Sequence, residues 1–172
     1  MNPALKFIFA RRSVRKFQNK DVPEKTVKDL LEASMAAPSA VAKDPWHFIV
    51  VRNAIMRKKL AEGLPYGKML MDSPVGIVVC GDMEKAHDRQ ISYLLQDCSA
   101  AIENLLVAVS VLGLGAVWLG VHPREERMAH VRAIFGLPEN IIPISAIAVG
   151  WPSEKPIART RYSGGAVHAE KW

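Results

Sequence analysis

The longest hydrophobic pattern in the chain lies between Asp88 and Leu112. Apolar residues recur there at helical spacing and form one wide stripe, which predicts a helix with a broad buried face. The stripe consists of Ile91, Leu94, Leu95, Cys98, Ile102, Leu105, Leu106, Val109 and Leu112. Because Asp97, Glu103 and Asn104 interrupt the apolar run, we expect a central core helix and not a membrane span. Its small residues would also permit a close contact with another subunit.

Four shorter apolar segments predict β-strands, because they are rich in β-branched and aromatic residues and are flanked by Gly, Pro, Asn or Asp. These segments are Trp46–Val51, Pro74–Cys80, Ala116–Val121 and Ile144–Trp151. The run that ends at Cys80 is continuously apolar, which is typical of a strand covered on both faces. We assign Trp46 and Trp118 to the core.

Three amphipathic segments alternate with these strands and predict helices. The first begins at Asp21, which we expect to cap the helix, and ends before Pro38. The others cover Ala54–Glu62, which Gly63 closes, and Pro123–Phe135. The alternation predicts an α/β or α+β fold in which helices cover both faces of one sheet.

Length and composition favour a single domain over residues 1–172. With 172 residues, of which 49% are hydrophobic, the chain can bury one core but not two ordinary ones. Residues 153–172 show no hydrophobic period. We expect this polar arm, which ends in Trp172, to dock on a partner subunit.

Cysteine and histidine usage favours a cytoplasmic protein without a metal site. Cys80 and Cys98 form no Cys-x-x-Cys pair and lie in apolar segments, so we expect buried free thiols. The five histidines lack metal-ligand spacing. No apolar export segment follows Arg11 and Arg12, so we do not interpret this pair as a twin-arginine signal.

A basic cluster at Arg11–Phe17 is the strongest candidate for binding chemistry, with four cations and a serine within six residues. Guanidinium groups bind phosphate oxygens in forked pairs, and a serine hydroxyl adds a hydrogen bond. Arg159 and Arg161 form a second small basic site. With a net charge of +6, the cluster fits a phosphate-bearing cofactor, a solvated surface or a nucleic-acid-binding face. The nucleic-acid alternative, for which no motif is present, would use Lys6, Arg11, Arg12, Arg15, Lys16 and Lys20.

Several motifs, taken in order along nearly the whole chain, resemble the nitroreductase family of flavoproteins and its short-chain members. Each motif alone is weak, and the ordered set is specific. The matching segments are Arg11–Phe17, Ala37–Ala40, Pro45–Val51, Asp97–Ala101, Glu103–Leu106, Leu112–Trp118, Gly150–Pro152 and Arg159–Arg161.

The resemblance implies an α+β fold, a three-layer α/β/α sandwich with a mixed central sheet flanked by helices. It also implies a homodimer that binds FMN at the subunit interface and takes hydride from NADH or NADPH. By matching position, the FMN phosphate would be held by Arg11, Arg12, Ser13, Arg159 and Arg161. The flavin ring would meet Arg15, Lys68, Leu119 and Gly120 of the same chain and Pro38, Ser39 and Ala40 of the partner chain.

Two positions depart from the family pattern. Ala42 and Asp44 stand where the family usually has Asn and Gln. Ala42 cannot form a side-chain hydrogen bond, and Asp44 would add an anion near the pocket. We therefore expect an unusual redox potential or electron acceptor.

The reaction that the resemblance implies is a ping-pong transfer of hydride through the flavin to a nitroaromatic, quinone or activated alkene. The flavin carries the chemistry, so no protein acid or base is required. Two alternatives keep the fold and change the reaction, namely reductive dehalogenation and flavin fragmentation.

Overall fold

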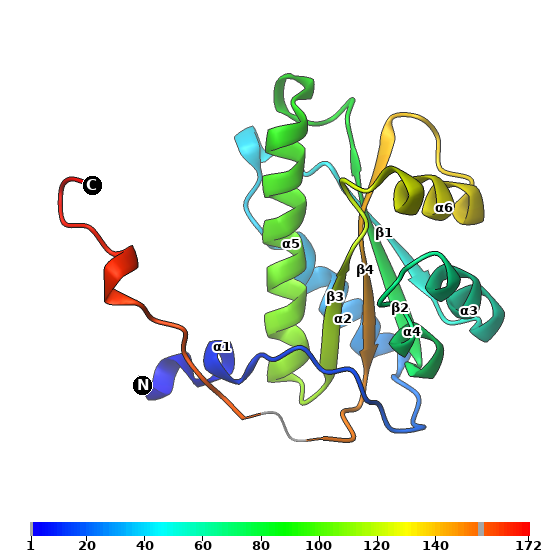
Figure 1. Ribbon diagram of the computed structural model, residues 1–172, viewed down its shortest axis with the longest axis horizontal. Coiled ribbons are helices and arrows are strands. Elements are labelled where there is room, and N and C mark those ends of the chain that lie inside the picture. The colour runs from blue at the N-terminus through cyan, green and yellow to red at the C-terminus, as the bar shows by residue number, and fades with distance from the viewer. Residues whose placement is uncertain (1, 155–156) are drawn as a thin grey trace.

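The computed structural model describes residues 2–154 and 157–172 and centres on one four-stranded sheet (Figure 1). The strand order is β1 (Trp46–Val51), β2 (Val75–Asp82), β4 (Ile141–Gly150) and β3 (Gly115–Gly120). Each neighbouring pair of strands is antiparallel. We expected a mixed sheet, with both parallel and antiparallel pairs. Within the described residues, the parallel pairing is limited to the isolated bridge between Ser13 and Ala116. Hydrophobic periodicity identifies strands but not the direction in which they pair.

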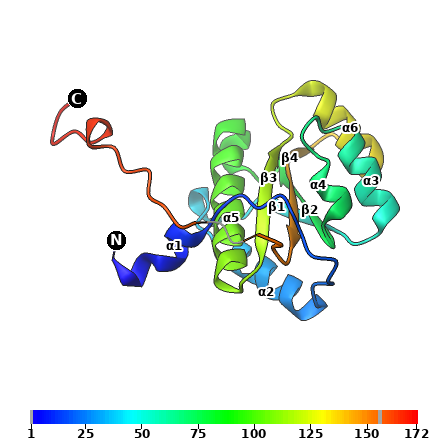
Figure 2. The ribbon, with the colours of Figure 1, turned by 60° about the horizontal axis from the view of Figure 1, so that its bottom comes forward.

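Helices cover both faces of this sheet, so the molecule has three layers, as expected of an α+β sandwich (Figures 1 and 2). The layer on one face consists of α2 (Glu24–Met35) and α5 (Ile91–Val111). The layer on the other face consists of α3 (Ala54–Glu62), α4 (Met69–Asp72) and α6 (Glu125–Phe135).

The continuously apolar strand β2 explains why both faces are covered. Successive side chains of a strand point to opposite faces. Ile77 and Val79 therefore join the core under α2 and α5, whereas Val78 and Cys80 join the core under α3 and α6. The prediction of a strand buried on both faces is confirmed.

The predicted elements are present, with some ends displaced. Asp21 does not cap α2, which begins after Pro23, and its carboxylate instead pairs with Arg52 at 3.1 Å. The long helix begins at Ile91 and not at Asp88, because Asp88 has a left-handed backbone (φ 50°) in the preceding 3-10 turn.

The long helix α5 is the core helix of the molecule. Its 21 residues are long and apolar enough to cross a membrane by length and composition alone. Its stripe, however, packs in the core with α2 and the sheet. Ser34 fastens the two helices together by donating from Oγ to the carbonyl of Ala101 at 2.7 Å.

The two cysteines are buried and free, as expected from the sequence. The Cys98 thiol lies 3.8 Å from the carbonyl of Cys80. Desolvation raises the pKa of both thiols to about 12, so they stay protonated at neutral pH and are poor nucleophiles.

The N-terminal helix α1 (Lys6–Ala10) leads into an extended segment that runs along β3. Val14 is held there because its N–H donates to the carbonyl of Ala116 at 2.9 Å. Gly115 makes the approach possible, since a Cβ at this position would lie 2.7 Å from Val14. The contacts with β3 therefore fix the position of the segment that follows α1.

The described part of the C-terminal arm, residues 157–172, extends away from the sheet (Figures 1 and 2). Every residue in it is exposed, including Trp172 at its end. Docking of this arm on a partner subunit stays a prediction.

Candidate functional site

Basic residues from both ends of the chain gather at one place. Desolvation lowers the pKa of the Arg12 guanidinium, and repulsion from Arg159 and Arg161 lowers it further. Arg11 has a partner, since its Nε lies 3.1 Å from Oε1 of Glu103 on α5. Among the described residues, no carboxylate pairs with the other three arginines. Their uncompensated charge is suited to a phosphate group.

Arg11 and Arg12 line a cavity of about 250 Å³ beside the C-terminal end of α5. Ser13 follows them directly, and its bridge to Ala116 fixes it on β3 with an exposed side chain. The arm approaches this segment, since the N–H of Arg159 donates to the carbonyl of Phe9 at 3.3 Å. Arg11 and Arg12 therefore share one cavity, with Arg159 and Arg161 close to Arg12 and with Ser13 next to Arg12 in the chain.

A second cavity of about 490 Å³ contains the four residues expected at the flavin ring from the same chain, which are Arg15, Lys68, Leu119 and Gly120. Leu119 buries its side chain in the core. Gly120 has open space where a Cβ would stand, which lets a ligand approach its backbone. We name this space the ring cavity.

We name the residues expected at the phosphate, which are Arg11, Arg12, Ser13, Arg159 and Arg161, the phosphate cluster. This cluster and the ring cavity lie within reach of one ligand. Arg12 and Arg15 are three residues apart on an extended segment, so at most about 11 Å separates their backbones. A molecule with a terminal phosphate on a short chain and a flat ring at the other end can contact both. FMN has this shape, and the residues present fit it.

Sequence reasoning missed Arg127, which also lines the ring cavity. It lies in the first turn of α6, and its Nη1 donates to the carbonyl of Gly120 at 2.9 Å. With Arg15 and Lys68 it makes three cations, and no carboxylate lines this cavity in the described chain. Its position in the sequence, shortly after the predicted strand β3, could have indicated a site residue.

Trp118 also lines the ring cavity and is 37% exposed, so its assignment to the core was wrong. It lies near the end of β3, an edge strand, where Trp118 and Gly120 are exposed, whereas Ala116 on the same face is buried in the core with α5. The assignment of Trp46 to the core is confirmed, with 7% of it exposed.

Pro38, Ser39 and Ala40 do not line these two cavities of their own chain. Ala40 is held from α5, because its N–H donates to Oδ1 of Asp97 at 2.8 Å. A contribution of this loop to a partner's flavin stays a prediction.

The two positions that depart from the family pattern lie in the same loop. Ala42 and Asp44 have left-handed backbones, with φ of 52° and 47°. Ser39 donates from Oγ to Oδ1 of Asp44 at 2.6 Å, and the N–H of Asp44 donates back to that hydroxyl at 3.0 Å. In this structure Asp44 therefore closes the loop on itself.

Two of the basic residues named for the nucleic-acid alternative have other contacts in the structure. Arg15 lines the ring cavity, and the ammonium of Lys20 lies 4.0 Å from the centre of the Trp151 ring. No group of three His, Cys, Asp or Glu side chains suited to a metal occurs in the described part of the chain.

Comparison with known proteins agrees with this geometry. The model of the nitroreductase family matches residues 8–64 and 57–151. A relative from Methanothermobacter thermautotrophicus, provisionally named NADH dehydrogenase/NAD(P)H nitroreductase, is 46% identical over 168 residues, which cover 98% of this chain and 87% of the relative. A crystal structure from Parabacteroides distasonis with the same provisional name is 39% identical, has a TM-score of 0.93 and covers 100% of both chains. A provisionally named nitroreductase from Desulfovibrio desulfuricans, solved in complex with FMN, is 30% identical, has a TM-score of 0.85 and covers 100% and 99% of the two chains. This chain belongs to the nitroreductase family.

Proposed function

We propose that this protein is an FMN-dependent oxidoreductase that carries hydride from NADH or NADPH to a small organic acceptor. The proposal rests on one observation, which is that Arg15, Lys68 and the end of β3 line the same cavity. A short extended segment connects this cavity to Arg12, which lies near Arg159 and Arg161. The names of the relatives described above point to the same cofactor and reductant.

When bound, FMN would supply the hydride-transfer chemistry that links the reduced nicotinamide to the acceptor. The chain holds and tunes this group. Arg12, with Arg159 and Arg161, offsets the phosphate charge. Arg15 and Lys68 place positive charge at the edge of the ring where negative charge develops, and preorganised charges of this kind lower the barrier.

The lining of the ring cavity indicates the class of acceptor. Trp118, Tyr66 and Met69 give it aromatic and apolar walls that suit a planar molecule. We propose nitroaromatics, quinones and activated alkenes, which bind after the nicotinamide has left and so give ping-pong kinetics. Neither a carboxylate nor a histidine lines the cavity in the described chain, and chemistry carried by the flavin requires no dedicated protein acid or base.

We also propose a cytoplasmic homodimer in which the flavin is shared between the subunits. Ile8, Val111 and Leu112 are exposed apolar residues that line a groove of about 590 Å³ along α1 and α5. A second copy on this face would bury them and bring its Pro38–Ala40 loop to the flavin.

The absorbance spectrum of the purified protein tests the function. We expect a yellow protein that releases FMN and not FAD, and that loses its flavin absorbance when NADH or NADPH is added without oxygen. Initial rates at varied donor and acceptor concentrations should give parallel double-reciprocal lines. A protein that stays colourless after incubation with FMN contradicts the proposal.

A further inference from the structure

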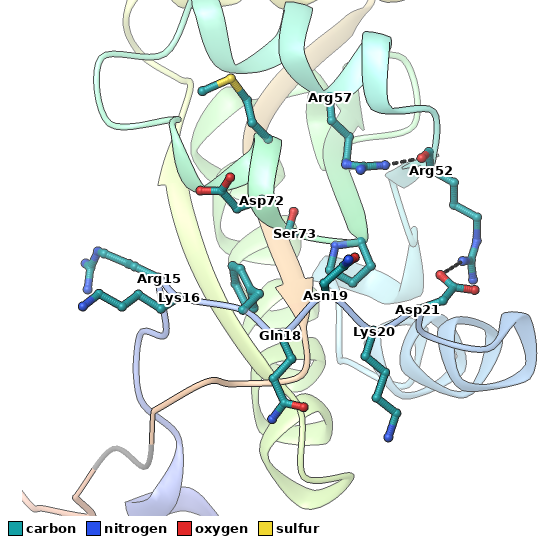
Figure 3. Close-up of a pocket in the computed structure, with 13 residues that line it drawn as sticks. Arg15, Lys16, Gln18, Asn19, Lys20, Asp21, Arg52, Arg57, Asp72 and Ser73 are labelled. Atoms are coloured by element: carbon teal, nitrogen blue, oxygen red, sulfur yellow. Dashed lines mark hydrogen bonds and ion pairs between the residues drawn. The ribbon is translucent and has the colours of Figure 1, made fainter.

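A third cavity, of about 700 Å³, lies along the segment that follows Arg15 (Figure 3). We name it the basic groove. Arg15 and Lys16 lie at one end, Arg52 and Arg57 lie at the other, and Ser73 lies between them. Because Arg15 also lines the ring cavity, the basic groove begins where the ring cavity ends.

The basic groove carries excess positive charge. Five cations and two carboxylates line it, and one of the carboxylates, Asp21, is already paired with Arg52 at 3.1 Å. Arg57 donates from Nη1 to the carbonyl of Arg52. Its Nε is buried and has no hydrogen-bond partner among the described residues. Desolvation lowers the pKa of this guanidinium, so an anion at this end would stabilise it.

Several lining residues of the groove already have partners, and Arg52 is one of them, since it donates to Asp21 and to the carbonyl of Val22. The amide of Gln18 donates to the carbonyl of Pro152 at 2.7 Å, and Lys20 lies over Trp151. Figure 3 shows the side chains of Gln18 and Lys20 pointing away from Ser73. The cations left for a ligand are therefore Arg15 and Lys16 at one end of the groove and Arg57 at the other.

Resting on the proposed function, we propose that the basic groove binds the phosphate-bearing half of the reductant and selects NADPH over NADH. With the nicotinamide in the ring cavity, the pyrophosphate lies near Arg15 and Lys16. The 2′-phosphate, by which NADPH differs from NADH, lies at the Arg52 and Arg57 end.

The dimensions agree with a ligand of this kind. The six steps from Arg15 to Asp21 span at most about 22 Å, which is the scale of an extended dinucleotide. A volume of about 700 Å³ falls within the range of small-molecule sites. Asn19 supplies a neutral polar group between the two charged ends, where the adenosine would lie.

The test compares three hydride donors in anaerobic stopped-flow reduction of the FMN-loaded protein. The donors are NADPH, NADH and 1-benzyl-1,4-dihydronicotinamide, which has no phosphate. We expect the wild type to favour NADPH. Because a charge-assisted hydrogen bond contributes roughly 1.5–3 kcal/mol, Arg57→Ala should lower kcat/KM for NADPH by ~10–150-fold. The same substitution should lower kcat/KM for NADH much less, and it should leave kcat/KM for the benzyl analogue unchanged.

Lys58→Ala is the matched control, because Lys58 is an exposed cation on the same helix and does not line the groove. Equal losses with NADPH and the benzyl analogue would mean that Arg57→Ala damages the enzyme, and the proposal would be overturned. A wild type that uses NADH as well as NADPH would overturn it too. If Arg57→Ala does not fold, Arg57→Lys should still lower the NADPH preference, because lysine lacks the forked geometry.

A binding measurement separates this proposal from the proposed function. Calorimetric titration of the holoprotein with NADP⁺ and with NAD⁺ needs no turnover. NADP⁺ should bind more tightly, and Arg57→Ala should remove the difference. If no donor reduces the flavin but this binding difference is found, the proposed function fails and the groove stands. If all donors reduce the flavin and no difference is found, the groove fails alone.

Discussion

The phosphate cluster and the ring cavity differ in how the fold supports them. The phosphate cluster joins the N-terminal segment to an exposed arm, and it is held by few contacts and disturbed by repulsion among its arginines. The ring cavity is built on β3 and on helices packed against the sheet. FMN affinity should therefore depend mainly on the chain ends, whereas the redox properties should depend on the sheet.

Deleting residues 157–172 should have the largest effect on this contrast. The deletion removes Arg159 and Arg161 together, so FMN affinity should fall by at least ~150-fold, the effect of about 3 kcal/mol. The dimer should weaken as well. Flavin fluorescence titration and sedimentation velocity measure the two effects. A truncated protein that stays dimeric and keeps its flavin would contradict the role given to the arm.

Single substitutions at the phosphate cluster come next. Arg12→Ala and Arg161→Ala should each weaken FMN binding by ~10–150-fold, because each removes a charge-assisted hydrogen bond. The midpoint potential should not change, since the phosphate charge is the same in both redox states. Arg124→Ala, an exposed cation at the start of α6, is the control and should leave both quantities unchanged.

Gly115→Ala should affect both regions at once. The new Cβ would lie 2.7 Å from Val14 and push the segment that carries Arg12 and Arg15 away from β3. Overpacking of this kind costs roughly 1–3 kcal/mol of unfolding free energy. Chemical denaturation, FMN titration and potentiometry should all change. Gly164→Ala has open space around its Cβ and should be neutral. If only the stability changes, the segment does not couple the two regions.

Arg15→Ala should have the smallest effect on affinity, below ~10-fold, because Arg15 is exposed and an ordinary hydrogen bond contributes only about 1 kcal/mol. The midpoint potential should nevertheless fall, since a cation leaves the place where negative charge develops. Arg15→Lys should restore part of the potential. Spectroelectrochemical titration measures this. Equal potential shifts for Arg12→Ala and Arg15→Ala would show that the two regions are not separate.

Much of the fold could be predicted from the sequence, because local patterns carry it. The continuous apolar run of β2 indicated burial on both faces, and the stripe of α5 indicated a core helix. The antiparallel pairing and the edge position of β3 could not be predicted, since both depend on contacts between distant segments. Trp118 was wrongly assigned to the core for the same reason, because the elements that pack over a strand decide whether its side chains are covered.

Some residues of the candidate site could likewise be predicted from the sequence, and others could not. Motif resemblance supplied Arg15, Lys68 and Gly120, and the structure brings these three together. Arg127 has no comparable motif, and its contact with Gly120 exists only because α6 folds back on the end of β3. The role of Asp44 in closing its own loop likewise depends on a left-handed backbone that the sequence does not reveal.

The gathering of Arg12, Arg159 and Arg161 makes the lifetime of the protein depend on its cofactor. Without a phosphate these like charges repel one another, so the arm is held less firmly against the N-terminal segment. A ligand that binds only the assembled form stabilises that form by mass action. Trypsin, which cleaves after arginine, should therefore cut at Arg159 and Arg161 faster in flavin-free protein. In a cell short of flavin, the same exposure would direct the empty protein toward degradation and leave the loaded molecules behind.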